Sequence, residues 1–112
     1  MRPHMAGKIT EESWVLLLNK GHRLIKKCQV SKGGFSQTDA DPKVAFRCAV
    51  QYGASAMIVM HNHPSNQLEP SKADRIVTNR FVRCGSLMGV DVLDHIIFGN
   101  TGFFSFKDHG LL

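Results

Sequence analysis

Apolar runs alternate with turn-forming residues in the first third of the chain and predict a strand hairpin. Residues 11–19 contain the run Trp14–Leu18, whose short length and polar flanks favour a buried strand. Asn19–His22 is typical of a hairpin turn, and a second strand is expected over residues 23–30. Residues 31–34, which include two glycines, are expected to form a flexible loop.

Two later segments place apolar residues at helical spacing. The first begins at Asp41-Pro42, with the aspartate as cap, and ends at Gly53. The second begins at Ser71 and ends at about Gly85 or Gly89. The apolar positions are Val44, Ala45, Cys48, Ala49 and Tyr52 in the first segment, and Ala73, Val77, Phe81, Cys84 and Met88 in the second. Lys72, Arg75 and Arg83 on the other face of the second helix are interpreted as a solvated surface.

The remaining apolar segments complete one sheet. Strands are expected at residues 55–61, 91–98 and 103–106, with a polar loop at 62–70 and a turn at 99–102. The order β-β-α-β-α-β-β predicts an α/β fold with a mixed β-sheet flanked by helices. A length of 112 residues fits a single domain, residues 1–112.

Composition narrows the class of protein. With 43% hydrophobic and 21% charged residues, the chain has the balance of a globular domain, which excludes disordered and membrane-spanning classes. The net charge is +5, and the basic residues are scattered along the chain. This charge permits an acidic partner without requiring one. The chain has an odd number of cysteines at wide spacing, namely Cys28, Cys48 and Cys84. This predicts buried thiols and no disulfide framework. Residues 1–10 lack the apolar core of a signal peptide, so we expect a cytoplasmic protein without membrane contact.

The residues that could bind a metal ion or take part in catalysis lie around the polar loop. His61 and His63 alternate at the end of a predicted strand, so both side chains can point to one face. Asp74, in the first turn of the next helix, can supply a carboxylate oxygen to the same point. Two imidazoles and one carboxylate are a zinc ligand set that leaves the fourth position for water, which is the catalytic pattern. A nearby carboxylate is needed as general base, and the candidates are Glu11, Glu12 and Glu69.

Each part also has an ordinary interpretation. A His-x-His pair is common at strand ends, and Ser71-x-x-Asp74 is also a capping box that opens a helix. Asp74 can cap the helix and bind a metal ion, and the spacing does not separate the two roles. Asp94-His95 can support the site or be purely structural. The combination of these parts, in this order, is what predicts a metal site.

The combination resembles a known motif. JAMM (MPN+) metalloproteases share a motif of four parts. A glutamate is followed after a long gap by His-x-His, then by seven residues, and then by Ser-x-x-Asp. The bacterial RadC family, a prokaryotic branch of that superfamily, is the closer match. The matching segments are Glu11–Leu18, His61–Ser65, Glu69–Ser71, Asp94–Ile97 and Ser105-Phe106. The resemblance implies the JAMM/MPN fold, a three-layer architecture like that of cytidine deaminases.

The resemblance also implies roles for single residues. In JAMM enzymes the two histidines and the aspartate bind zinc, the serine stabilises the oxyanion, and the glutamate is the general acid/base. These roles fall on His61, His63, Asp74, Ser71 and Glu11. Glu11 aligns better than Glu12, and strand alternation allows only one of them to face the metal. The chain departs from the family at Ser13, where an aromatic residue is usual, and at Asn66, where glycine is usual.

These features predict a zinc-dependent hydrolase that cuts a peptide or isopeptide bond in a target that the sequence does not identify. The alternative is a DNA-associated accessory module in repair or recombination with a non-catalytic metal site, because the RadC resemblance brings an association with DNA repair. RadC proteins often carry an upstream helix-hairpin-helix segment, which we do not expect within residues 1–112. We expect weak, salt-sensitive DNA binding at most. An exposed strand edge could also pair with a second copy.

Overall fold

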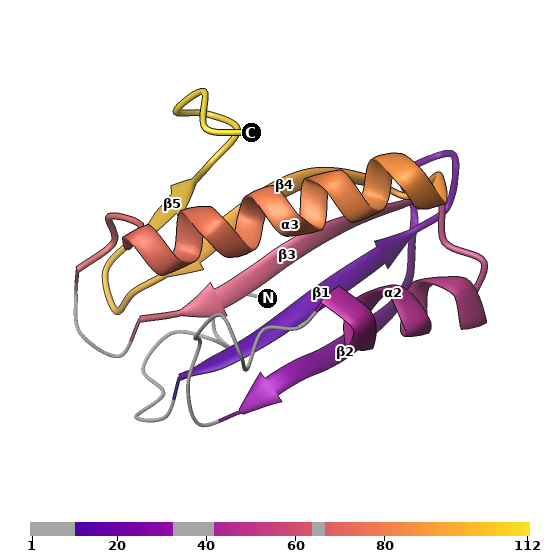
Figure 1. The fold of residues 1–112 in the computed structure, drawn as a ribbon. Coiled ribbons are helices and arrows are strands. Elements are labelled where there is room, and N and C mark those ends of the chain that lie inside the picture. Colours follow the sequence, from indigo (N-terminus) through magenta and orange to yellow (C-terminus); the bar gives the residue numbers. More distant parts are fainter. Residues whose placement is uncertain (1–10, 33–41, 64–66) are drawn as a thin grey trace.

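The computed structural model describes residues 11–32, 42–63 and 67–112, and these form an α/β fold. The elements follow the predicted order (Figure 1). They are β1 (Glu12–Leu18), β2 (Leu24–Lys32), α2 (Pro42–Gln51), β3 (Ala56–Asn62), α3 (Lys72–Met88), β4 (Asp91–Phe98) and β5 (Phe103–Ser105).

The five strands form one mixed sheet in the order β2-β1-β3-β4-β5. β3 and β4 are parallel, and every other neighbouring pair is antiparallel. Parallel neighbours need a crossover connection, and α3 provides it here. Because a crossover helix begins beside the carboxyl end of the strand before it, the end of β3 and the start of α3 lie at the same edge of the sheet.

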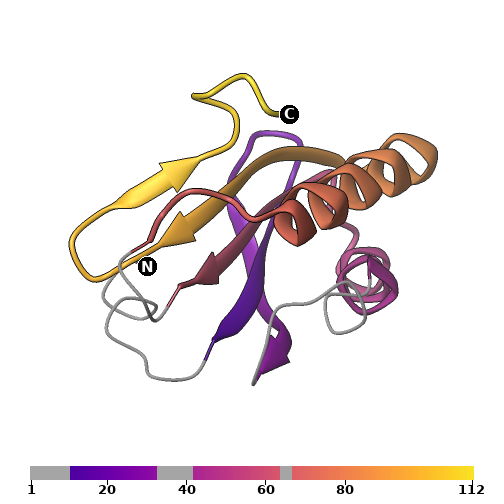
Figure 2. The same ribbon diagram turned by 60° about the vertical axis from the view of Figure 1, so that its left-hand side comes forward.

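Both described helices pack on one face of the sheet (Figure 2). The core beneath them consists of alternate residues of β1 and β3 together with the apolar stripes of the helices. Its buried members are Val15, Leu17, Ala45, Phe46, Ala49, Met57, Val59, Val77, Phe81 and Val90. The opposite face carries a smaller cluster around the buried Met60 and Phe98. A third layer, which the family resemblance implies, is not present among the described residues.

Local signals in the sequence account for most of the boundaries. The Asn19 carbonyl accepts the N–H of His22 at 2.9 Å, which closes the predicted hairpin turn. α3 starts with a capping box at Ser71 and ends at Gly89, whose φ of 71° suits glycine. Met88 is 49% exposed, so its place on the apolar face of α3 was wrong. Met88 is the last residue of α3, and Val44 and Tyr52, which were predicted on the other apolar stripe, are exposed in the same way. Asp41 and the two glycines at 33–34 lie outside the described residues.

The cysteines require a correction. Cys28 on β2 and Cys48 on α2 form a disulfide, and Cys84 is a free thiol. The expectation of three thiols was wrong because α2 packs beside β2 and brings together two residues that are 20 apart in sequence. All three side chains are only partly buried, although they do pack against the main core. Within the described residues, no helix is both long and apolar enough to cross a membrane.

Candidate metal centre

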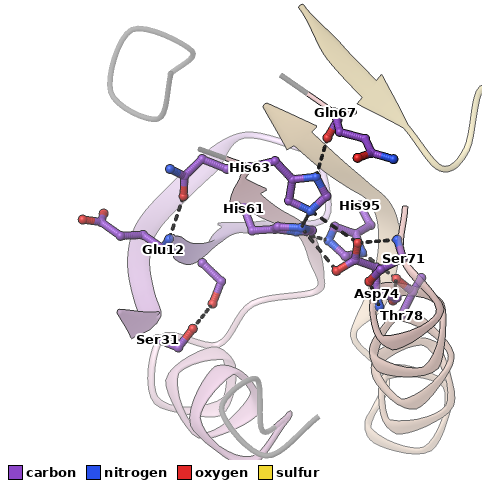
Figure 3. A network of polar contacts seen from close by, with 11 residues as sticks. Glu12, Ser31, His61, His63, Gln67, Ser71, Asp74, Thr78 and His95 are labelled. Carbon is purple, nitrogen blue, oxygen red and sulfur yellow. Dashed lines mark hydrogen bonds and ion pairs between the residues drawn. The ribbon is translucent and has the colours of Figure 1, made fainter. Parts of the chain in front are cut away.

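Three elements meet at the edge of the sheet and bring the candidate ligands together (Figure 3). His61 is on β3 and its side chain is fully buried, on the face that α3 covers. His63 follows the end of β3, where its N–H donates to the carbonyl of Phe98 at 2.8 Å. Asp74 is buried in the first turn of α3. The strand, the residue after it and the helix therefore each place one polar side chain at this edge.

The three side chains present their donor atoms to one another. Nε2 of His61 and Nε2 of His63 are 3.0 Å apart. The two carboxylate oxygens of Asp74 each lie 3.4 Å from one of these nitrogens. Ligand atoms at 2.0–2.1 Å from a tetrahedral zinc ion lie about 3.3 Å from one another. The spacing of the donor atoms therefore fits one small metal ion.

Of the three candidate bases, Glu11 lies at this centre. One carboxylate oxygen of Glu11 and one ring nitrogen each from His61 and His63 all lie within 4.8 Å of one another. Glu12, one residue on, has its side chain on the other face, where its carboxylate accepts from the indole N–H of Trp14 at 3.1 Å. Glu69 is exposed and is not part of this group. The alternation of side chains along the start of β1 thus separates the two neighbouring glutamates.

Ser71 and Asp74 form the capping box and contribute to the centre at the same time. The Ser71 hydroxyl accepts from the N–H of Asp74 at 3.0 Å, and the Asp74 carboxylate accepts from the N–H of Ser71 at 2.7 Å. The capping bond uses the Ser71 oxygen as an acceptor, so its own proton stays available to a second partner. Ser71 is exposed, which lets that proton reach a bound molecule.

The orientation of His63 is set by the backbone. Its Nδ1 lies 2.7 Å from the carbonyl oxygen of Gln67. A carbonyl only accepts, so Nδ1 carries the proton, and in the neutral ring Nε2 keeps a lone pair. That lone pair faces Asp74 and His61. No motif in the sequence indicates the contact between His63 and the carbonyl of Gln67.

Burial and charge shift the pKa values at the centre in different directions. Burial lowers the pKa of His61 well below its usual value, and the neighbouring His95 adds to the effect. For His63, the bonds to Asp74 and to the Gln67 carbonyl outweigh burial, so its pKa is raised. Burial acts to raise the pKa of Asp74, but the bond to His63, the neighbouring His61 and the N–H of Ser71 outweigh it and lower this pKa to about 2. Burial raises the pKa of Glu11, which suits a group that must accept and then return a proton.

Two further residues adjoin the centre. His95 on β4 is fully buried, and its Nε2 lies 2.7 Å from Nδ1 of His61. Thr78 on α3 lies between His95 and the backbone of Asp74. The sequence leaves the role of His95 open, and none of its motifs includes Thr78. One signal could have identified Thr78. It is a hydroxyl residue on the buried side of the predicted helix, four residues after the candidate ligand Asp74.

Comparison with known proteins identifies the family. The model of the RadC-like JAB domain matches residues 1–111. A UPF0758 protein of Flavobacterium johnsoniae is 40% identical over 99% of this chain and 48% of its own length. The UPF0758 protein YeeS of Escherichia coli is 40% identical over 97% of this chain and 74% of its own length. The chain spans about half the length of most of the curated relatives that it matches. This chain therefore belongs to the RadC family of JAB domains.

Proposed function

We propose that this domain is a zinc-dependent hydrolase that cuts a peptide or isopeptide bond. The observation that carries the proposal is the spacing of 3.0–3.4 Å among Nε2 of His61, Nε2 of His63 and the carboxylate oxygens of Asp74. Membership in a JAB-type family supports the same reading. These three residues would hold the ion. Zinc supplies Lewis acidity and a nucleophilic water at neutral pH when it is bound in such a site.

Two further residues have roles in the proposed reaction. Glu11 transfers protons, and Ser71 stabilises developing negative charge. Glu11 takes a proton from the attacking water and delivers it to the leaving amine. Its raised pKa favours the second of these steps, because the protonated carboxyl persists closer to neutral pH. Ser71 donates its hydroxyl proton to the oxyanion that develops on the carbonyl. Glu11 directly precedes β1, and Ser71 is the N-cap of α3.

Metal content is the first test. The protein is purified without an affinity tag or added metal, and zinc is measured by elemental analysis in the wild type, His63→Ala and His109→Ala. We expect about one zinc per chain in the wild type, with a loss in His63→Ala, because three protein ligands are needed to hold the ion. His109 is exposed, is bonded to the carbonyl of Ser105 and is not one of the candidate ligands, so His109→Ala should retain zinc.

Failure to take up zinc at neutral pH, with or without added metal, would contradict the proposal. Equal zinc in wild type and His63→Ala would place the ion elsewhere and contradict it as well. A zinc-loaded wild type is then screened against peptide and isopeptide substrates.

Four further expectations stay predictions. They are the peptide or protein substrate, weak DNA association, pairing with a second copy, and the cytoplasmic location.

A further inference from the structure

A line of buried polar contacts joins the side chain of His61 to the backbone of Asp74 through His95 and Thr78. His61 Nδ1 lies 2.7 Å from His95 Nε2, and His95 Nδ1 lies 2.5 Å from the Thr78 hydroxyl. The Thr78 hydroxyl donates to the backbone carbonyl of Asp74 at 2.8 Å. The four side chains lie together at the candidate site (Figure 3). All four residues are at most 2% exposed. The line therefore joins β3, β4 and α3 without contact with bulk water.

The chemistry of each group fixes the direction of every bond in this line. The Asp74 carbonyl can only accept, so the single hydroxyl proton of Thr78 is committed to it. Thr78 must then accept from His95, which places the His95 proton on Nδ1. His95 is fully buried, and in the neutral ring the proton on Nδ1 leaves Nε2 as an acceptor. His61 consequently donates from Nδ1, and its Nε2 keeps a lone pair on the side of His63 and Asp74.

We propose that Thr78 and His95 are positioning residues that hold His61 in the tautomer whose Nε2 can bind a metal ion. The inference rests on the proposed metal site for its purpose, and on the buried contacts alone for its geometry. The line starts at the backbone of Asp74, which is itself a candidate ligand. Two ligands from different elements are thus tied to one another behind the site, so that a shift of α3 relative to β3 would break the line.

His95 also has a packing role, and the test must separate the two. Its ring stacks on Phe106 at a centroid distance of 4.5 Å, so large substitutions at His95 change the core itself. Thr78 offers a cleaner pair of variants. Thr78→Val keeps the shape and removes the hydroxyl, whereas Thr78→Ser keeps the hydroxyl and removes a methyl group. The two variants therefore separate the hydrogen bonds from the packing.

The first readout is the tautomer of His61 in the metal-free protein, measured from long-range proton–nitrogen NMR correlations at mildly alkaline pH. The ring is assigned from the signals that disappear in His61→Gln. We expect the proton on Nδ1 in the wild type and in Thr78→Ser. In Thr78→Val the fixed donor order is lost, and we expect a mixture with protonated Nε2. A wild-type ring with its proton on Nε2 would overturn the inference, whether or not the protein binds zinc.

The second readout is the zinc dissociation constant, measured by competition with a chromophoric chelator. Residues that orient a metal-binding histidine typically change metal affinity by roughly 10–100-fold, so we expect a loss of that size in Thr78→Val. Thr78→Ser should stay near the wild type. Unchanged affinity in a folded Thr78→Val would overturn the inference. If Thr78→Val does not fold, wild-type affinity in Thr78→Ser together with the Nδ1 proton supports the inference, and a 10-fold loss in Thr78→Ser contradicts it. A protein that binds no zinc at all defeats the proposed function, while the NMR result still decides the tautomer.

Discussion

Glu11 and Glu12 are neighbours in the chain but have different surroundings. The Glu11 carboxylate lies with the ring nitrogens of His61 and His63, and that of Glu12 lies with the indole of Trp14. The pair therefore provides a matched test. With a substrate in hand, we expect Glu11→Gln to lower kcat by roughly 10²–10⁴, the contribution typical of a positioned general acid/base. Glu12→Gln keeps an acceptor for Trp14 and should retain most of the activity.

Steady-state kinetics on zinc-loaded protein distinguish these variants. Zinc content is measured alongside, because a variant that loses the ion loses activity for another reason. A Glu11→Gln variant with full zinc and wild-type kcat would remove Glu11 from the proposed mechanism. A large loss in Glu12→Gln instead would mean that the chain entering β1 presents the other glutamate during catalysis.

Ser71 has a structural and a proposed chemical role, and two variants can separate them. Ser71→Ala removes both the cap and the hydroxyl, and should cost about 1 kcal/mol of stability. Ser71→Gly keeps most of the cap, because glycine costs only a few tenths of a kcal/mol at that position. Both variants should lose about 10²–10³ in kcat, the usual effect of one oxyanion donor. Full activity in Ser71→Gly, with stability loss only in Ser71→Ala, would leave Ser71 as a cap alone.

At the scale of elements, the junction of α3 and β4 fixes the position of the helix that carries Asp74. Gly85 is buried in α3, and a Cβ built on it would overlap the backbone carbonyl oxygen of Val90. We therefore expect Gly85→Ala to destabilise the fold by about 1–3 kcal/mol, although alanine is the better helix former. Ser86→Ala is the control, because Ser86 is exposed in the same turn and gains only the helical preference.

Urea unfolding followed by circular dichroism measures both variants. A Gly85→Ala protein as stable as the wild type would show that the helix can move away from Val90 at little cost. In that case zinc affinity becomes the informative quantity, since the same movement shifts Asp74 relative to His61. Ser86→Ala should be equal to the wild type or slightly more stable.

The elements could be predicted because their signals are local. The Trp14–Leu18 run, the Asn19 turn and the Ser71 capping box each act within a few residues. The candidate ligands also stood out, because His-x-His and Ser-x-x-Asp are short patterns at the ends of elements. The contacts that no local pattern reveals are those between elements. His61 meets His95 across 34 residues, and Cys28 meets Cys48 across 20, where only the packing of the sheet and helices decides.

At the scale of the whole molecule, the buried histidines couple stability to pH. Burial lowers the pKa of His95 to about 4 and that of His61 well below its usual value, compared with about 6.5 in an unfolded chain. The unfolded state thus binds more protons than the folded state as the pH falls below that value, and stability is lost on acidification. Asp74, with a pKa of about 2, acts in the same direction at still lower pH. His63 acts in the opposite direction, but its side chain is 15% exposed and its shift is partly screened.

We therefore expect metal-free protein to be most stable near neutral or mildly alkaline pH and to lose stability between about pH 6.5 and pH 4. The shift of His95 alone corresponds to about 3 kcal/mol when fully developed. Urea unfolding at several pH values after chelation measures it. His95→Gln can still accept from His61 but does not titrate, so its stability should fall less steeply with acid. If wild type and His95→Gln lose stability with the same slope, the protonation of His95 is not what limits the stability of the fold at low pH.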